Sequence, residues 1–438
     1  MADYPSSKWA GHGGLTDLVD YWNAARANAI SDEVVAVETE LGTDPAGDFD
    51  DVAARLAAID AQLMTFYDPD AGSCVYVPPF ALSAVDYGGF VIQQFPASQP
   101  NATADDDNPD VADGAAVGAT KAHSKMGVSP WREITSLEAR KACVNIGLGW
   151  HLITAFEWAS LAYWAQLMGT QPHGPNGDTD PPSDVTYTDE EGLRDRALAA
   201  RGAHDSALTG SGPVTWAHNH QACGVYGLNG VLWQWNDGLF LLPENQNDNS
   251  DTPHAITGAG EAGYCLILAN REVSLTLAPY GSSTATAAGS LTDTNKSYVV
   301  NAFTGHYLYD SAGSLFYIDS NSAGALTIDG ANTPAAGPYT IVKLKATNIT
   351  SGMTSGHRIL TLSADADLAP LAIPATSDAT GSATYGNDGY WHAATALRAA
   401  VRGGYWASGV RAGVFALNLA SAPSYRNVGV GFRACKSL

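Results

Sequence analysis

The last part of the chain, "RGGYWASGVRAGVFALNLASAPSYRNVGVGFRACKSL" (402–438), alternates between two kinds of sequence. Constrained segments (RGG, W, AGVFALNL, AP and GFR) combine glycine, proline and large apolar residues. The segments between them (Y, AS, VR, AS and YRNVG) share no charge, size or polarity. RGG predicts a backbone that needs the freedom of glycine or a close approach. Trp406, Phe415, Leu417, Leu419 and Phe432 predict the buried side of the strands and loops that carry the rest.

Helix and strand signals lie upstream of this stretch. "SPWREITSLEARKAC" (129–143) and "HLITAFEWASLA" (151–162) predict two helices, because Thr135 or Ser136 precedes Glu138 and Thr154 precedes Glu157, as in a capping box. The segments "CVYVPPFAL" (74–82), "GGFVI" (88–92) and "GVYGLNGVLWQWNDG" (224–238) predict short strands separated by turns.

In this order, the four upstream pieces and the end of the chain resemble the formylglycine-generating-enzyme subtype of the C-type lectin fold. The residues that carry the resemblance are Thr154, Glu157, Trp158, Gly230, Val231, Trp233, Trp235, Arg402, Gly403, Gly404, Trp406, Gly431, Phe432 and Arg433. The resemblance implies an α+β, C-type-lectin-like domain formed by residues 66–271 and 345–438.

Two further regions differ in composition from this expected domain. Residues 272–344 are rich in Ser, Thr, Gly and Tyr and predict a small all-β module inserted into it. Residues 1–65 predict a helical segment, because apolar residues recur from Ile30 to Leu41 at the spacing of a short coiled coil; an antiparallel helical hairpin is the alternative. This segment loosely resembles N-terminal parts of phage tail and fibre proteins, which implies attachment to other virion or tail subunits.

Composition restricts the classes of partner. The formal charge of −23 disfavours binding to nucleic acid and to anionic membranes. No run of 18 apolar residues and no signal-peptide pattern is present in the sequence, so we expect synthesis in the cytoplasm and no membrane insertion. After Asp388 there are six Arg or Lys residues and no acid, and we interpret some of these arginines as buried hydrogen-bond donors.

The alternation in residues 402–433 resembles the variable region of proteins diversified by diversity-generating retroelements, such as the phage major tropism determinant family. In that family, adenine-specific mutagenesis scatters residues at some codons and leaves their neighbours unchanged. The resemblance implies that this region is hypervariable, and that its binding positions are Tyr405, Ala407, Ser408, Val410, Arg411, Ala420, Ser421, Tyr425, Arg426, Asn427, Val428 and Gly429.

The sequence therefore predicts a non-enzymatic receptor-binding protein that determines host tropism, with neither catalytic residues nor a cofactor. Its expected ligand is a cell-surface macromolecule, either protein or glycan, and its expected location is the virion surface, in a tail or fibre. Tyr405 and Tyr425 would be amphipathic anchors of this surface, and Arg411 and Arg426 would add planar hydrogen bonding. Whether the chain forms a homo-oligomer stays open.

Two alternatives remain from other functional classes. The first is a metal-dependent oxidase resembling the formylglycine-generating enzymes, for which His218, His220 and Cys223 in "HNHQAC" are the nearest ligands. The second is a non-variable structural tail component. The acidic loop 105–113 raises a separate question of calcium binding, but it lacks the spacing of an EF-hand loop, so we expect no metal site there.

Overall fold

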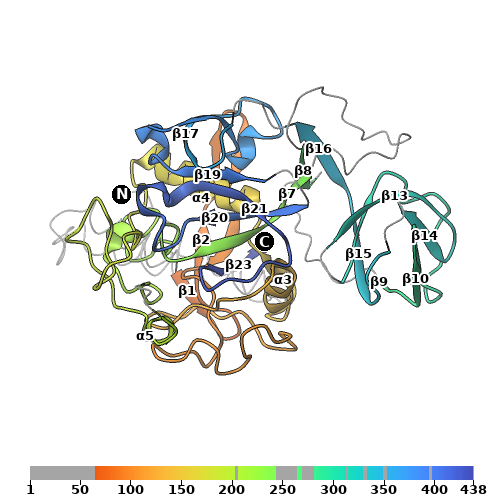
Figure 1. The fold of residues 1–438 in the computed structure, drawn as a ribbon, viewed down its shortest axis with the longest axis horizontal. Helices are drawn as coiled ribbons and strands as arrows, with labels where there is room; N and C mark the ends of the chain where they lie inside the picture. The colour runs from red at the N-terminus through yellow and green to blue at the C-terminus, as the bar shows by residue number, and fades with distance from the viewer. Residues whose placement is uncertain are drawn as a thin grey trace, which may run out of the picture. The chain divides into compact units, whose positions relative to one another are not determined.

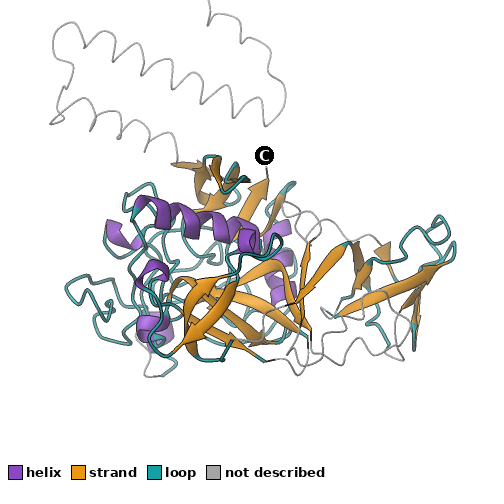
Figure 2. Ribbon diagram, turned by 90° about the horizontal axis from the view of Figure 1, so that it is seen from above, coloured by secondary structure: helices purple, strands orange, loops and turns teal. Residues whose placement is uncertain are grey.

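The computed structural model describes residues 65–202, 206–242, 264–268, 281–311, 314–328, 333–348, 353–393 and 397–437. The expected helical segment 1–65 lies outside them apart from Thr65. The expectation of an α+β, C-type-lectin-like fold is wrong, because the described chain is mostly β-structure (Figures 1 and 2). Its α-helices are α3 (Ser136–Val144), α4 (Ala155–Met168) and the single turn α5 (Arg196–Ala199).

The largest sheet contains nine strands and includes most of the C-terminal stretch. β20 is hydrogen-bonded between β7 and β21, β21 pairs in parallel with β19, and Figure 1 shows these strands side by side. In order the strands are β16 (Leu344–Asn348), β8 (Tyr264–Leu268), β7 (Trp233–Leu242), β20 (Arg398–Gly403), β21 (Gly413–Ser421), β19 (Gly389–His392), β17 (His357–Leu362) and β18 (Pro374–Asp378), with β22 (Val430–Gly431) paired to β7.

A five-stranded sheet holds the end of the chain. Its order is β1 (Thr65–Asp68), β2 (Gly72–Val77), β5 (Phe90–Gln93), β23 (Ala434–Ser437) and β6 (Trp150–Leu152). β23 is therefore inserted between two strands that precede it by hundreds of residues. A separate hairpin consists of β3 (Phe80–Leu82) and β4 (Val85–Tyr87).

The two long helices begin where the sequence predicts them. Thr135 Oγ1 accepts a hydrogen bond from the Glu138 amide at 3.2 Å, and Thr154 Oγ1 accepts one from the Glu157 amide at 3.1 Å. Each glutamate in turn accepts from the backbone N–H of its threonine, so both capping boxes are confirmed. α4 is buried from Ala155 to Tyr163, and its Trp158 indole donates to the Val414 carbonyl of β21 at 2.7 Å. The start of β21 is thereby fixed to a helix of the core.

The described part of the expected inserted module forms a seven-stranded antiparallel sheet. Its order is β10 (Ala285–Ala287), β11 (Ser290–Thr292), β14 (Ala325–Ile328), β13 (Leu315–Asn321), β12 (Tyr307–Tyr309), β15 (Pro338–Val342) and β9 (Gly281–Ser282). Leu291, Leu308, Ile318 and Leu326 are fully buried in a cluster of their own. Within the described residues, these strands pair only with one another.

Short 3₁₀ turns complete the described chain, and the one in the C-terminal stretch matters most here. These turns are η1 (Val214–Trp216), η2 (Ala369–Leu371), η3 (Ala383–Tyr385) and η4 (Gly409–Arg411). η4 interrupts the connection between β20 and β21 and exposes Arg411. Over the ranges that the structure describes, none of the helices has the length and apolar character needed to cross a membrane.

Candidate ligand-binding pocket

The turn after β20 depends on glycine, as the RGG motif predicts. Gly403 and Gly404 have φ values of 97° and 78°, in the region that residues with a Cβ rarely adopt. A Cβ on Gly404 would also lie 2.5 Å from the Cβ of Ala412. The chain therefore leaves β20 and reaches η4 through a turn that another residue would strain.

Two buried arginines hold the strands around this turn. Arg402 donates to the carbonyls of Phe415 at 3.3 Å and Leu371 at 2.6 Å. Arg433 donates to Gln234 Oε1 at 2.8 Å and to the Gln93 carbonyl at 2.9 Å. Burial lowers the pKa of Arg402 to about 10 and that of Arg433 to about 9, which leaves both charged at neutral pH. The interpretation of these arginines as buried donors is confirmed.

Apolar side chains of the constrained segments fill the space beneath the same strands. Trp406, Phe415, Leu417, Leu419 and Phe432 are at most 1% exposed, as predicted from the sequence. The Arg132 guanidinium lies 5.9 Å from the Trp406 ring centroid, and Trp131 packs edge-on against Phe432. The constrained segments are thus core residues, and the segments between them occupy the loops and strand ends above.

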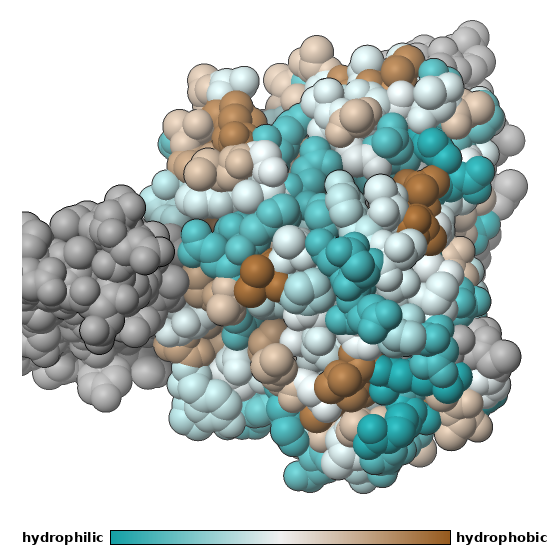
Figure 3. Space-filling view, turned by 90° about the vertical axis from the view of Figure 1, so that its left-hand side faces the viewer, coloured by the Kyte–Doolittle hydropathy of each residue, from teal (hydrophilic) through white to brown (hydrophobic). Residues whose placement is uncertain are grey.

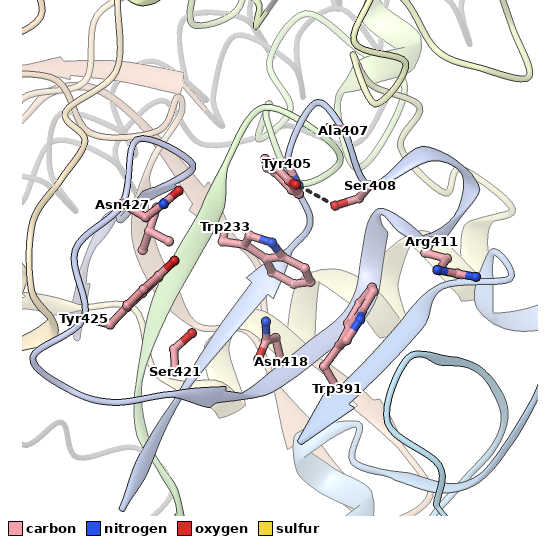
Figure 4. Close-up of a pocket in the computed structure, with 11 residues that line it drawn as sticks. Trp233, Trp391, Tyr405, Ala407, Ser408, Arg411, Asn418, Ser421, Tyr425 and Asn427 are labelled. Atoms are coloured by element: carbon pink, nitrogen blue, oxygen red, sulfur yellow. Dashed lines mark hydrogen bonds between the residues drawn. The ribbon is translucent and has the colours of Figure 1, made fainter. Parts of the chain in front are cut away.

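Those loops and strand ends enclose a pocket of about 400 Å³ (Figure 4). Its walls come from β7, β19, β21, β22 and the two loops that flank β21. The lining residues are Trp233, Trp391, Tyr405, Ala407, Ser408, Arg411, Asn418, Ser421, Tyr425, Asn427 and Val430. The volume lies within the range of about 300–1,000 Å³ typical of small-molecule sites.

Seven of the twelve positions proposed from the sequence line this pocket: Tyr405, Ala407, Ser408, Arg411, Ser421, Tyr425 and Asn427. They come from three separate parts of residues 402–433 and meet around one space. Their role in binding stays a prediction, but the structure brings them together.

Five proposed positions lie elsewhere. Val410 is exposed on η4, Ala420 and Val428 are half-buried outside the lining, and Gly429 is buried there. Arg426 is held by an ion pair of 2.5 Å between its Nη2 and Glu138 Oε1 at the start of α3. The Arg426 guanidinium is therefore turned toward the loop 111–117 and lines a separate narrow crevice there.

Four lining residues were not among the sequence predictions. Trp233 and Trp391 stand at 5.3 Å between ring centroids with an interplanar angle of 87°, and form two perpendicular faces of the pocket. Asn418 and Val430 complete the set. Asn418 is the one polar side chain among the otherwise apolar residues Val414 to Leu419. This irregularity in the sequence could have indicated that Asn418 is a pocket residue. Trp391 gave no local signal.

Gly389 provides the space that Trp391 occupies. A Cβ on Gly389 would lie 2.2 Å from Cη2 of Trp391 and 3.0 Å from Cβ of Arg411. Beside it, the carboxyl of Asp388 is buried and accepts hydrogen bonds from the amides of Phe415 at 2.7 Å and Ala416 at 3.2 Å. Burial raises the pKa of Asp388 well above its ordinary value. The buried carboxyl of Asp388 and the absence of a side chain at Gly389 thus position Trp391 and β21 at the pocket wall.

The polar side chains of the pocket already use some of their oxygens. Asn418 Oδ1 accepts from the Ala420 amide at 2.7 Å, and Asn427 Oδ1 accepts from the Gly429 amide at 2.8 Å. Ser408 Oγ accepts from the Tyr405 amide at 3.1 Å, which is the dashed line in Figure 4. These bonds fix the orientation of both asparagine amides, because the side-chain oxygen must face the backbone N–H.

Both histidines considered as metal ligands form hydrogen bonds with backbone groups. His218 is buried, and its Nδ1 accepts a hydrogen bond from the Val225 amide at 2.9 Å. Burial, with smaller effects of Arg433 and His220, lowers the pKa of His218 to about 3. Across the described ranges, no group of three His, Cys, Asp or Glu side chains is arranged to hold a metal ion.

Two arginines form ion pairs with the acidic loop 105–113. Arg196 pairs with Asp105 at 2.5 Å, and Arg201 pairs with Asp107 at 2.6 Å and with Asp113 at 2.5 Å. Of these, Asp107 is buried, and burial raises its pKa. Three carboxylates of this loop therefore act as partners of arginine side chains.

Surface hydrophobicity adds no second site on the face drawn in Figure 3. There, hydrophobic residues form small groups separated by hydrophilic ones. Large contiguous apolar patches are the usual mark of a protein interface, and this face of the described chain does not present one. The sequence matches no known protein-family model and no curated protein.

Proposed function

We propose that this chain is a ligand-binding protein whose residues 402–433 form a hypervariable surface diversified by a retroelement, and that it acts as a viral or phage tropism determinant. The observation that carries the proposal is the convergence of seven positions, selected by their irregular residue types, around a single pocket. If those positions were arbitrary parts of a loop, there would be no reason for them to share one concave surface.

The construction of the region supports diversification. The constrained residues, including Arg402, Trp406 and Arg433, are buried and hold the strands. Most of the irregular residues lie on loops or at a strand end and are exposed or half-buried, where substitutions disturb core packing least. Antibody paratopes solve the same problem with variable loops on a rigid scaffold.

Binding, in this proposal, needs no covalent chemistry and no cofactor. The target is a macromolecule on a cell surface, either protein or glycan, and the chain is displayed on a virion tail or fibre. Residues 1–65 would attach it to other virion subunits. The formal charge of −23 disfavours nucleic acid as the target.

The genetic test is to sequence the DNA downstream of the gene in several isolates of one population. We expect a near-copy of the bases that encode residues 402–433, with mismatches only at adenines, beside a reverse transcriptase gene. Codons for Tyr405, Ala407, Ser408, Arg411, Ser421, Tyr425 and Asn427 should vary, and codons for Arg402, Trp406 and Arg433 should not. An invariant C-terminus with no repeat would contradict the proposal.

A functional test separates a binder from a structural tail component. Tyr405→Ser with Tyr425→Ser removes both tyrosines from the pocket. We expect particles that carry this double variant to assemble in normal yield and to lose adsorption to host cells. Failure of assembly with intact folding of the isolated chain would favour the structural alternative.

A further inference from the structure

The unused polar atoms of the pocket are mainly hydrogen-bond donors. The side-chain oxygens of Asn418 and Asn427 already accept hydrogen bonds from backbone amides. Each side chain is therefore left with its NH₂ group to donate to a ligand. Neither nitrogen has a hydrogen-bond acceptor among the described residues. Figure 4 shows the Asn418 nitrogen pointing from β21 toward the Trp233 ring. A ligand that matches this pocket must therefore bring acceptors.

The charge of the pocket agrees with that donor excess. No Asp or Glu lines it, although the chain as a whole carries a formal charge of −23. Arg411 is exposed at the pocket wall and forms no ion pair with any described residue. Arg426, the other arginine of the same loops, is already neutralised by Glu138. Among the described residues the Arg411 guanidinium thus has no acidic partner, and such a group is suited to bidentate contact with a carboxylate.

The remaining walls are flat and aromatic. The perpendicular rings of Trp233 and Trp391 stand beside Asn418, and Tyr405 and Tyr425 approach from the two loops (Figure 4). Such rings pack against the C–H face of a flat or ring-shaped ligand, while the tyrosine and serine hydroxyls can donate to or accept from hydroxyl groups at its edge. The pocket combines apolar faces with a rim of donors.

We infer that the pocket binds an acidic saccharide, a sugar ring whose C–H face packs on the half-buried ring of Trp391, with Trp233 perpendicular beside it, and whose carboxylate pairs with Arg411. This inference rests on the proposed function only in taking the pocket as the binding site. A pyranose ring has an apolar face, which can pack on the aromatic walls, and a rim of oxygens, which can accept hydrogen bonds from Asn418 and Asn427. The overall negative charge opposes a long polyanion, so the ligand is a glycan with a single acidic residue at the contact.

The test compares two probes that differ only in the acidic group, methyl β-D-glucuronide and methyl β-D-glucoside. Their dissociation constants are measured on the full chain by isothermal titration calorimetry or ligand-detected NMR. Because a charge-assisted hydrogen bond is worth about 1.5–3 kcal/mol, we expect the glucuronide to bind about 10- to 150-fold more tightly. Equal affinities, or no binding of either probe, would overturn the inference.

Two substitutions assign the effect to the pocket. Asn418→Asp keeps the oxygen that accepts from the Ala420 amide but exchanges the donor for a negative oxygen, and should weaken glucuronide binding at least about 10-fold. Arg411→Gln should bring the glucuronide close to the affinity of the glucoside. Arg196→Gln removes an exposed arginine outside the pocket lining and is the matched control, expected to leave both affinities unchanged. Loss in the control equal to that in Arg411→Gln would overturn the assignment.

An acidic peptide provides the competing ligand class. The blocked tripeptide Ac-Glu-Tyr-Glu-NH₂ carries carboxylates and one aromatic ring but no rim of sugar hydroxyls. Tighter binding of this peptide than of the glucuronide would overturn the inference, and weaker binding would support it. The genetic test above is independent of this one. If the codons vary in a population but the protein does not bind the glucuronide, the proposed function stands and only the inference of a saccharide ligand is wrong.

Discussion

Arg402 and Arg411 stand nine positions apart in one stretch of sequence and differ in almost every structural respect. Arg402 is fully buried and donates to the backbone of two other segments. Arg411 is exposed on a 3₁₀ turn and pairs with no described acid. The comparison separates two parts of the region: a buried polar framework (Arg402, Arg433 and Asp388) that holds the strands, and a rim of exposed side chains (Arg411 and Tyr425) above it.

The largest effect is expected from removing a framework arginine. Arg433→Met leaves Gln234 Oε1 and the carbonyls of Gln93 and Tyr226 without this donor in the core. Each unsatisfied buried group costs about 1–3 kcal/mol, so the free energy of unfolding should fall by about 3 kcal/mol or more. Urea denaturation measures the change. Arg411→Met is the control and should change stability by less than about 0.5 kcal/mol; similar losses in both would break the distinction between framework and rim.

Next in size is the glycine turn that joins framework and rim. Gly404→Ala introduces a Cβ at positive φ and 2.5 Å from Ala412, and should destabilise the protein by about 1–3 kcal/mol. Gly409 also has a positive φ, 57°, but a Cβ there would meet no atom within 4 Å. Gly409→Ala should therefore cost clearly less, about 1 kcal/mol. Thermal denaturation of the two variants separates the cost of the contact with Ala412 from the cost of the positive φ. Equal losses of stability would argue against the close approach at Ala412.

Asp388 gives the framework a pH dependence. Burial raises its pKa in the folded state, so the folded protein holds this proton more tightly than the unfolded chain does. Its stabilising contribution is complete below the unfolded pKa of about 3.9 and is lost as the pH rises through the folded pKa. Between those two pKa values, the free energy of unfolding should fall by up to about 1.4 kcal/mol per pH unit. Asp388→Asn should remove this decline, as measured by urea denaturation between pH 4 and pH 8; an unchanged pH profile would show that Asp388 does not titrate there.

The smallest effect on stability is expected at the rim. Tyr425 is 43% exposed, and Tyr425→Ser should change the free energy of unfolding by about 0.5 kcal/mol or less. Binding should weaken much more, since tyrosine is a frequent hot spot of recognition surfaces. Parallel measurement of unfolding and of ligand affinity on the same sample checks this. A large loss of stability would place Tyr425 in the framework instead.

Local features were the most predictable from the sequence. The capping boxes at Thr135 and Thr154, the glycine turn after Arg402 and the buried apolar side chains from Trp406 to Phe432 depend on residues close together in the chain. The fold class predicted from the sequence was wrong, because the prediction gave two clear helices and a pattern of short motifs more weight than the many weak strand signals. Short strands rich in Ser, Thr and Gly carry little periodicity of their own, and their pairing is decided by distant partners.

The sequence by itself determined which positions of the C-terminal stretch are constrained, because glycine turns and large apolar residues have strong local or packing requirements. Only the tertiary structure decided which irregular positions face the pocket. It brings Trp233 and Trp391, from strands remote in sequence, against Asn418, and it diverts Arg426 to Glu138 at the start of α3. The physical reason is that a side chain's partners across a sheet are set by strand register and neighbouring loops, which no single stretch of sequence records.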